Sequence, residues 1–155
     1  SRSARMSLLD VPYLPQHEPG GCLVACAAMV LAYLEQPALQ SDIARQIDAR
    51  PAGVPASNIR RLAAWGLKVQ YGQGSLNELS AALSMGNAPI VFLRTSELPY
   101  WQEDTPHAVV LIGIGTESAF LLDPAYESKT PVSVAVGDFL LAWSHFDMVY
   151  ALITK

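Results

Sequence analysis

Charged side chains are scarce in this sequence. They make up 15% of its 155 residues, whereas apolar residues make up 51%. An intrinsically disordered chain needs low hydrophobicity and high charge, so this balance excludes disorder. The chain has only 2 cysteines, too few for the disulfide framework of a small secreted domain. Its longest apolar run, Cys22 to Leu34, has 13 residues, and a membrane-spanning helix needs about 20.

A basic surface is also missing. Lys and Arg number 10 against 14 Asp and Glu, which gives a net charge of −4. Nucleic-acid binding depends on clustered basic side chains that neutralise phosphates, so we expect no nucleic-acid partner. The first six residues carry charge but have no apolar stretch behind them, which does not predict an intact signal peptide. The cytoplasm is therefore the expected compartment, although a signal peptide removed from the sequence would leave the same start.

A chain of 155 residues falls within the range of about 100–200 residues for one domain. Folded domains of this size bury about two-thirds of the surface that the unfolded chain exposes, so the core needs no disulfide or metal to hold it. We expect residues 1–10 to form a flexible lead-in and residues 11–155 to form a single domain.

The first half of that domain is predicted to be mainly helical. Residues 22–35 are almost wholly apolar, which is typical of a helix buried on all sides. Shorter helices are expected over residues 41–47 and 57–65, the second ending at Gly66. Ser75 and Glu78 have the spacing of a capping box, which predicts a further helix that ends at Gly86.

The second half is predicted to consist mainly of strands. One strand is expected early, over residues 67–71, and five more follow over residues 89–93, 107–114, 119–122, 132–136 and 148–153. One helix, over residues 138–143, interrupts them. Helices and strands that are segregated in this way favour an α+β fold over an alternating α/β fold. A helical lobe packed on an antiparallel sheet lobe would leave a cleft between the two.

Cys22 stands where a polar, glycine-rich loop meets the long apolar helix. The N-terminus of a helix carries about half a positive charge and free N–H groups, which lower the pKa of a thiol and make it a nucleophile. The alternative is a small buried side chain, and that interpretation applies with more force to Cys26, one turn further along. We expect no disulfide between the two, because both side chains point the same way along one helix.

His107 opens an apolar strand, and Asp123 ends the next one. If the two strands pair about a turn centred near Gly115, each residue lies eight positions from the turn, at the same end of the ladder. A base beside the carboxylate that orients it is what an activated nucleophile requires. The simpler interpretations are a strand-edge histidine and a turn aspartate before proline. His17 and His145 are expected to be solvated.

Gln16 lies six residues before Cys22. Its side chain could donate an N–H to an oxyanion, with the backbone N–H of Cys22 as the second donor; the alternative is a solvated loop residue. His17, Cys22 and Cys26 do not complete a four-ligand metal site, because no further cluster of cysteine and histidine is present. No metal or cofactor is therefore expected.

In this order and spacing, the residues resemble the papain-like cysteine peptidases that process bacteriocin leaders. The motifs that carry the resemblance are Gln16 with Cys22, His107-Ala-Val-Val-Leu-Ile-Gly and Leu122-Asp123-Pro124. The resemblance covers residues 11–154 and implies a papain-like fold with the nucleophile on a buried helix. It also implies that Cys22 is the nucleophile and His107 the general base and acid, while Asp123 orients His107 and Gln16 helps to form the oxyanion hole.

Two positions differ from the pattern of that family. Leu23 follows the cysteine where glycine is usual, and Gly21 precedes it where an acidic residue is common. Members that cut after a double glycine are fused to an exporter, and this sequence shows no transporter or nucleotide-binding segment. We therefore do not expect the double-glycine specificity to carry over.

The expected function is a cysteine peptidase that hydrolyses a peptide bond in a peptide or protein substrate. Two alternatives stay open: acyl or amide transfer on the same residues, in which an amine replaces water, and a degenerate module that binds a peptide without cutting it. The sequence predicts neither the physiological substrate nor the oligomeric state.

The segment from Thr95 to Pro106 joins two strands and delivers the chain to His107. Tyr100 and Trp101 lie together in it, among acidic residues, and exposed aromatic side chains beside a catalytic base are suited to contact a peptide. We expect the pair to bind substrate and the acidic neighbours to favour basic residues near the cut. The alternative is that Trp101 attaches the loop to the body of the protein.

Overall fold

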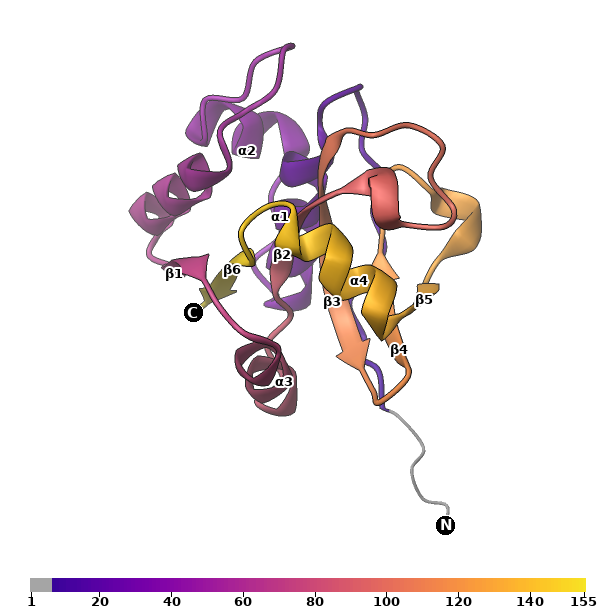
Figure 1. Cartoon of the computed structure of the whole chain (residues 1–155). Helices are drawn as coiled ribbons and strands as arrows, with labels where there is room; N and C mark the ends of the chain where they lie inside the picture. Colours follow the sequence, from indigo (N-terminus) through magenta and orange to yellow (C-terminus); the bar gives the residue numbers. More distant parts are fainter. Residues whose placement is uncertain (1–6) are drawn as a thin grey trace.

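The computed structural model describes residues 7–155, which form a six-stranded antiparallel sheet with helices on both faces (Figure 1). The strand order is β1-β6-β2-β3-β4-β5. The strands are β1 (Lys68–Gln73), β2 (Ile90–Arg94), β3 (Pro106–Ile114), β4 (Ser118–Leu122), β5 (Val132–Ala135) and β6 (Val149–Thr154). The helices are α1 (Cys22–Tyr33), α2 (Gln40–Gln46), α3 (Leu76–Ser84) and α4 (Val136–Ser144), and the 3-10 helices are η2 (Ala56–Trp65), η3 (Thr95–Glu97) and η4 (Glu127–Lys129).

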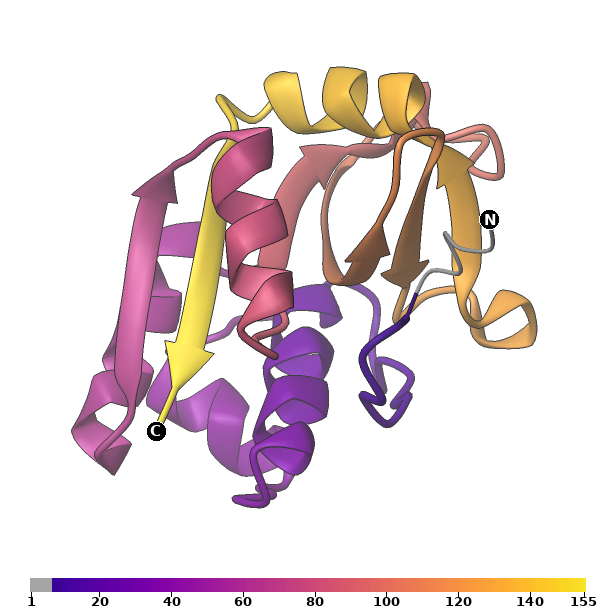
Figure 2. The same cartoon turned by 90° about the horizontal axis from the view of Figure 1, so that it is seen from below.

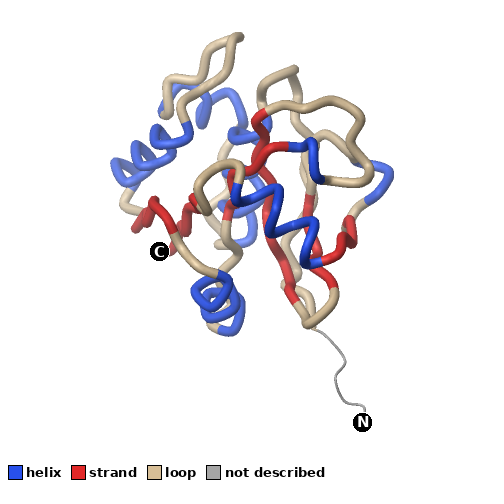
Figure 3. The backbone as a smooth tube through the Cα atoms, in the orientation of Figure 1, coloured by secondary structure: helices blue, strands red, loops and turns tan. Residues whose placement is uncertain are grey.

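The predicted α+β fold is confirmed, and each expected helix and strand is present within a few residues of its predicted bounds. Figure 3 shows the strands gathered at the centre and the helices around them. Gly66 ends η2 with φ 83°, and Gly86 follows α3 with φ 82°, both in the left-handed region that glycine adopts without strain. Ser75 caps α3 as predicted, because its hydroxyl accepts the backbone N–H of Glu78 at 3.2 Å.

The sheet lies between two hydrophobic cores. Side chains alternate along each strand, so Phe92 of β2 faces the core built by α1, α2 and η2, whereas Val91 faces the core built by α3 and α4. Figure 2 shows α1 and α4 on opposite faces of the sheet. Residues Leu23–Leu31 of α1 are all buried, as expected for a helix that is apolar all round.

A β-bulge shifts the pairing of β3 with β4. Val110 pairs with Leu122, but Gly113 pairs with Phe120, and the register changes between Leu111 and Gly113. If the pairing of Val110 with Leu122 is continued by one residue, Asp123 lies opposite position 109 and not opposite His107. The register predicted by counting from the turn is therefore wrong by two residues. A shift of two residues keeps a side chain on the same face of the sheet. Diagonal neighbours on one face can also reach each other, so the side chains of His107 and Asp123 still meet.

The N-terminal segment runs in extended form along this part of the sheet. The backbone N–H of Leu9 donates to Ile112 at 2.9 Å, and that of Gln16 donates to Pro124 at 3.0 Å. Between them, the hydroxyl of Tyr13 donates to the backbone carbonyl of Asp123 at 2.8 Å. Residues 1–6 of the expected lead-in lie outside the described residues. Within residues 7–155, no helix combines the length and apolar character needed to cross a bilayer.

Candidate active site

Cys22 is the first residue of α1 and is half-buried. No side chain caps this end of the helix, so the thiol lies beside backbone N–H groups that have no partner within the helix. Burial opposes ionisation of the thiol and is the largest single influence, but the imidazole of His107 and the backbone N–H groups of Leu23 and Ala108 together hold the pKa of Cys22 below its usual value. Cys26 is fully buried, and desolvation raises the pKa of its thiol well above the usual value. The two thiols of this chain are therefore chemically distinct.

His107, near the start of β3, connects this thiol to Asp123. Its Nε2 lies 2.8 Å from Oδ1 of Asp123, which leaves Nδ1 as the ring nitrogen that can face Cys22. Burial disfavours the charged imidazolium, but hydrogen bonds to Asp123 and to Cys22 raise the pKa of His107 to about 9. The sequence prediction that His107 and Asp123 lie side by side is thus met in the structure, although the roles assigned to them remain predictions.

Asp123 is fully buried and receives four hydrogen bonds. Oδ1 accepts the bond from His107 and one from the backbone N–H of Ala125 at 2.9 Å, while Oδ2 accepts the hydroxyl of Tyr100 at 2.6 Å and Nε1 of Trp101 at 3.0 Å. Burial disfavours the carboxylate, but these donors, led by His107, keep the pKa of Asp123 below its usual value. A buried carboxylate needs such donors to stay ionised.

The polar atoms of Tyr100 and Trp101 therefore point at Asp123. The ring of Trp101 also meets the ring of His107 edge-on, with centroids 4.8 Å apart. Burial and the Asp123 charge raise the pKa of Tyr100, so its hydroxyl stays a donor. Of the acidic neighbours, Asp104 pairs with Arg94 at 3.0 Å, and Glu97 lies 3.4 Å from His145. The pair was expected to bind substrate, and its bonds to Asp123 were not predicted. An aromatic pair shortly before a histidine does not indicate such bonds.

Gln16 lies next to the loop that precedes Cys22. A Cβ placed on Gly21 would be 3.8 Å from the Cβ of Gln16 and 3.0 Å from the carbonyl oxygen of Glu18. Nε2 of Gln16 donates to that carbonyl at 3.1 Å, and Oε1 is buried with no hydrogen-bond partner among the described residues. The amide is thus anchored at one atom, beside the residue that precedes Cys22.

A cavity of about 320 Å³ opens at Cys22 and His107. Its other walls come from the loop that precedes α1, the segment after α2, β2, the start of β3 and the turn after α4. Among the side chains that line it are Leu23, Val54, Phe92 and Phe146. Neither Tyr100 nor Trp101 is among the lining residues. This apolar lining could not be predicted, because its residues come from five separate segments of the chain.

The arrangement suits nucleophilic attack on a carbonyl. A thiol of lowered pKa, an imidazole in the same cavity and a buried carboxylate bonded to that imidazole are the parts of such a site. His17 and His145 take no part in it; His145 lies 3.4 Å from Glu97, and both histidines are exposed, as expected. Among residues 7–155, no group of three potential metal-ligating side chains is present.

The sequence model of the Peptidase C39-like family matches residues 8–155. This chain belongs to that family. No curated protein sequence matches it.

Solved structures share the fold of this C39-like chain. A candidate C39-like peptidase from Bacillus anthracis has a TM-score of 0.78 and 20% identity, with 97% of this chain and 98% of the other covered. A double-glycine-motif protease from an AMS/PCAT transporter, solved with the leader peptide, has a TM-score of 0.72 and 20% identity over 96% and 94% of the chains. The peptidase domain of Streptococcus ComA, a transporter involved in quorum sensing, has a TM-score of 0.74 and 15% identity over 92% and 96%.

Membership of the Peptidase C39-like family and these neighbours support a cysteine peptidase. The structure also places the two residues at which this chain departs from the family pattern. Leu23 is 3% exposed, packs in the core and borders the cavity, so it does not cover the thiol from outside. At position 21, a side chain would press on the carbonyl of Glu18, which favours glycine there.

Proposed function

We propose that this chain is a cysteine peptidase that hydrolyses a peptide bond through Cys22, with His107 as general base and acid, Asp123 as the group that orients His107, and Gln16 in the oxyanion hole. The observation that carries the proposal is that His107, held by the buried carboxylate of Asp123 at 2.8 Å, lines the same cavity as the thiol at the start of α1 and lowers its pKa. The family supports the reaction class, and one structural neighbour was solved with a leader peptide.

The first half of the reaction forms a thioester. The thiolate of Cys22 attacks the carbonyl carbon, and the displaced electron pair moves onto the carbonyl oxygen. The backbone N–H of Cys22 and the side-chain amide of Gln16 stabilise that oxyanion. When the C–N bond breaks, Nδ1 of His107 gives its proton to the leaving amine.

The second half releases the acyl group. His107, now neutral, takes a proton from water at Nδ1, and the hydroxide attacks the thioester carbon. The C–S bond breaks, the acid leaves, and Cys22 regains its thiolate beside the imidazolium. Asp123 holds Nε2 throughout, which keeps the other ring nitrogen directed at the thiol. If an added amine replaces water as acceptor and gives an amide product, the chain is an acyl transferase.

The pH dependence of thiol alkylation tests the proposal without a substrate. Because the pKa of Cys22 is lowered, its labelling by iodoacetamide is expected to rise with pH and reach half its plateau below pH 9.0, the ordinary value for a thiol. Cys26, whose pKa is raised, should label slowly throughout and is the internal control. Hydrolysis should fall as the pH rises through about 9, where His107 loses the proton that the leaving amine needs. Equal, slow labelling of both cysteines would instead favour an inert binding module.

Removal of the hydroxyl of Tyr100 tests whether it acts on Asp123 or on substrate. Tyr100→Phe leaves Oδ2 with one of its two donors, so kcat is expected to fall about tenfold while KM stays near its original value. Trp101→Phe, which removes the other donor to Oδ2, should lower kcat to a similar extent. Tyr126→Phe is the matched control, since its ring packs on both side chains at 5.0 and 5.1 Å. A rise in KM with kcat unchanged would restore the substrate-binding interpretation.

The contribution of Gln16 is tested by removal of its amide. Gln16→Ala is expected to lower kcat by roughly 10²–10³-fold, the usual cost of one oxyanion donor. Gln40→Ala is the matched control, because Nε2 of Gln40 donates to the neighbouring carbonyl of Pro15 at 2.9 Å and supports the same segment. Similar losses in the two variants would mean that Gln16 only shapes the loop.

A further inference from the structure

The cavity at Cys22 has walls suited to one kind of side chain. Among the described residues, those that line it include no Asp, Glu, Lys or Arg, and its only ionisable groups are Cys22 and His107. The remaining walls are largely apolar, from Leu23, Val54, Phe92 and Pro106 among others. A charged group in such a place would lose its hydration without gaining a partner, whereas an apolar group loses nothing.

The volume of the cavity limits the size of the group that it can bind. Pockets for drug-sized ligands span about 300–1,000 Å³, and this one, at about 320 Å³, is at the lower end. It has room for one or two amino-acid side chains rather than for a folded segment. Since the thiol and the imidazole form part of the wall, a peptide bond that reaches Cys22 brings the neighbouring side chain into the cavity.

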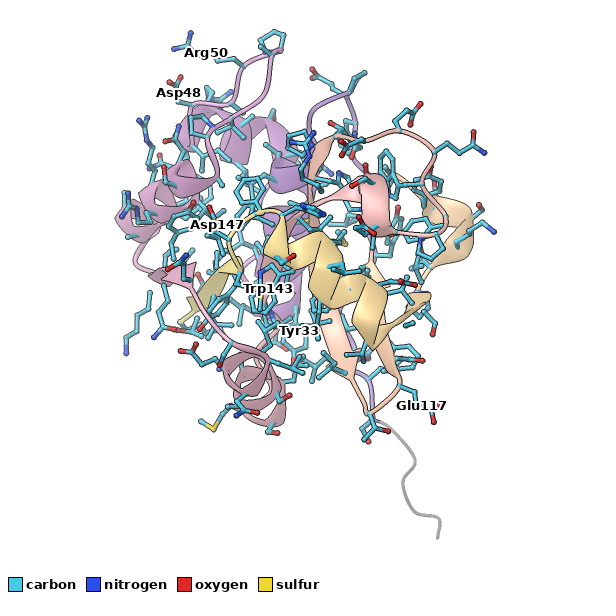
Figure 4. The ribbon with its side chains drawn as sticks, viewed as in Figure 1. Tyr33, Asp48, Arg50, Glu117, Trp143 and Asp147 are labelled. Carbon is cyan, nitrogen blue, oxygen red and sulfur yellow. The ribbon has the colours of Figure 1, made fainter. Side chains whose placement is uncertain are left out.

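Phe146 closes the cavity from the turn between α4 and β6. Its ring lies 5.9 Å from that of Phe92, centroid to centroid. The two residues that follow, Asp147 and Met148, both have φ 59°, a conformation that residues other than glycine rarely adopt and that the surrounding structure must enforce. Figure 4 shows Asp147 in this turn and Trp143 on the adjacent helix.

Buried contacts hold the turn in place. Trp143 is fully buried, and its Nε1 donates to the carbonyl of Val149 at 2.8 Å on the far side of the turn. Its backbone carbonyl accepts the N–H groups of Phe146 at 2.9 Å and Met148 at 3.2 Å. Phe146 is therefore a preformed wall of the cavity.

We propose that this cavity binds an aliphatic or aromatic side chain of the peptide substrate, adjacent to the bond that is cut, and that Phe146 is the residue that selects it. This inference rests on the proposed peptidase function. It differs from the expectation of basic residues near the cut, because Asp104 is paired with Arg94 and no acidic side chain lines the cavity among the described residues.

Peptidyl chloromethyl ketones test this proposal at the thiol itself. Two series of acetyl-tripeptide reagents carry Leu, Phe, Gly, Glu or Lys at the last or the penultimate position, and the rate of Cys22 modification is followed by intact mass. In one of the two series, Leu and Phe reagents are expected to react at least tenfold faster than Gly, Glu and Lys reagents. Rates that do not depend on the variable residue, or that favour Gly or Lys, would overturn the proposal.

Variants assign the preference to the cavity wall. Phe146→Ala should lower the Leu-to-Gly rate ratio about tenfold, whereas Phe120→Ala, the same change at a half-buried site on β4 away from the cavity, should leave the ratio unchanged. Val54→Glu, in a partly exposed segment, should shift the preference toward the Lys reagent and gives a second measurement if Phe146→Ala does not fold. Unchanged ratios in both variants would overturn the role of these walls.

Labelling by iodoacetamide distinguishes a failure of the proposed function from a failure of the proposed side-chain subsite. If Cys22 is no more reactive than Cys26 toward this reagent, which has no side chain to bind, the proposed function fails. If Cys22 is reactive but shows no side-chain preference toward the peptidyl reagents, the function stands and the subsite is refuted.

Discussion

Cys22→Ala is expected to abolish peptide hydrolysis, with a loss on the order of 10⁴-fold or more, whereas Cys26→Ala should retain it. Only the first thiol lies at the helix start and lines the same cavity as His107; the second lies fully buried one turn deeper. Initial rates on a fluorogenic peptide library, with the folded fraction checked by circular dichroism, give the comparison.

The two cysteine variants also show whether the assignment of Cys22 as the nucleophile is wrong. Cys26→Ala removes a buried sulfur and is expected to lower stability modestly, which a urea titration would detect without any change in the activity of the folded fraction. Full activity in Cys22→Ala, or an equal loss of activity in the two variants, would exclude Cys22 as the nucleophile.

Asp123→Asn is expected to reduce kcat by about 10²–10⁴-fold, as in other triads. Without the carboxylate, Nε2 of His107 loses its charged acceptor, so the pKa of His107 should fall from about 9 and the midpoint of Cys22 labelling should rise. This linked change in the pH profile distinguishes an effect on His107 from general damage to the fold.

The same substitution should also cost stability. Asp123 accepts four hydrogen bonds, and an amide turns one acceptor oxygen into a donor, so two of those donors lose their partner. We expect a loss of about 1–3 kcal/mol for each buried group left unpaired, measured by urea unfolding. Asp104→Asn is the matched control, since it breaks an exposed ion pair of the Thr95–Pro106 loop and should change neither property much. Parent-like kinetics in Asp123→Asn would leave this residue with a structural role alone.

Local patterns were sufficient to predict the fold. The apolar run of α1, the Ser75 and Glu78 spacing before α3 and the short apolar runs of β2 and β3 each depend on neighbours in sequence, and each element formed as predicted. The pairing register of β3 with β4 was not predicted, because the turn is centred between Thr116 and Glu117, where Gly115 donates to Ser118 at 2.8 Å, and not at Gly115. The bulge between Leu111 and Gly113 shifts the pairing back by only one position.

The surroundings of the site could be predicted less well than its central residues. Cys22, His107 and Asp123 were picked out because each stands at the start or end of an element, where side chains face clefts. Tyr100 and Trp101 were expected at the surface, because a loop rich in polar residues gives no indication that it folds back. Thr95 causes that fold, since its hydroxyl donates to Glu103 at 2.5 Å and accepts the N–H of Thr105 at 3.0 Å.

The long-range attachment of the N-terminal segment has a consequence for biosynthesis. Tyr13 and Gln16 bind the backbone at Asp123 and Pro124, more than a hundred positions later in the chain. During translation, Cys22 and all of α1 leave the ribosome before β3 and β4 exist, and domains generally fold as units. Until then the thiol has no His107 beside it to lower its pKa, so a nascent chain carries an ordinary cysteine. On the proposed function, reactivity toward peptide bonds would therefore be acquired in the same step as the native fold.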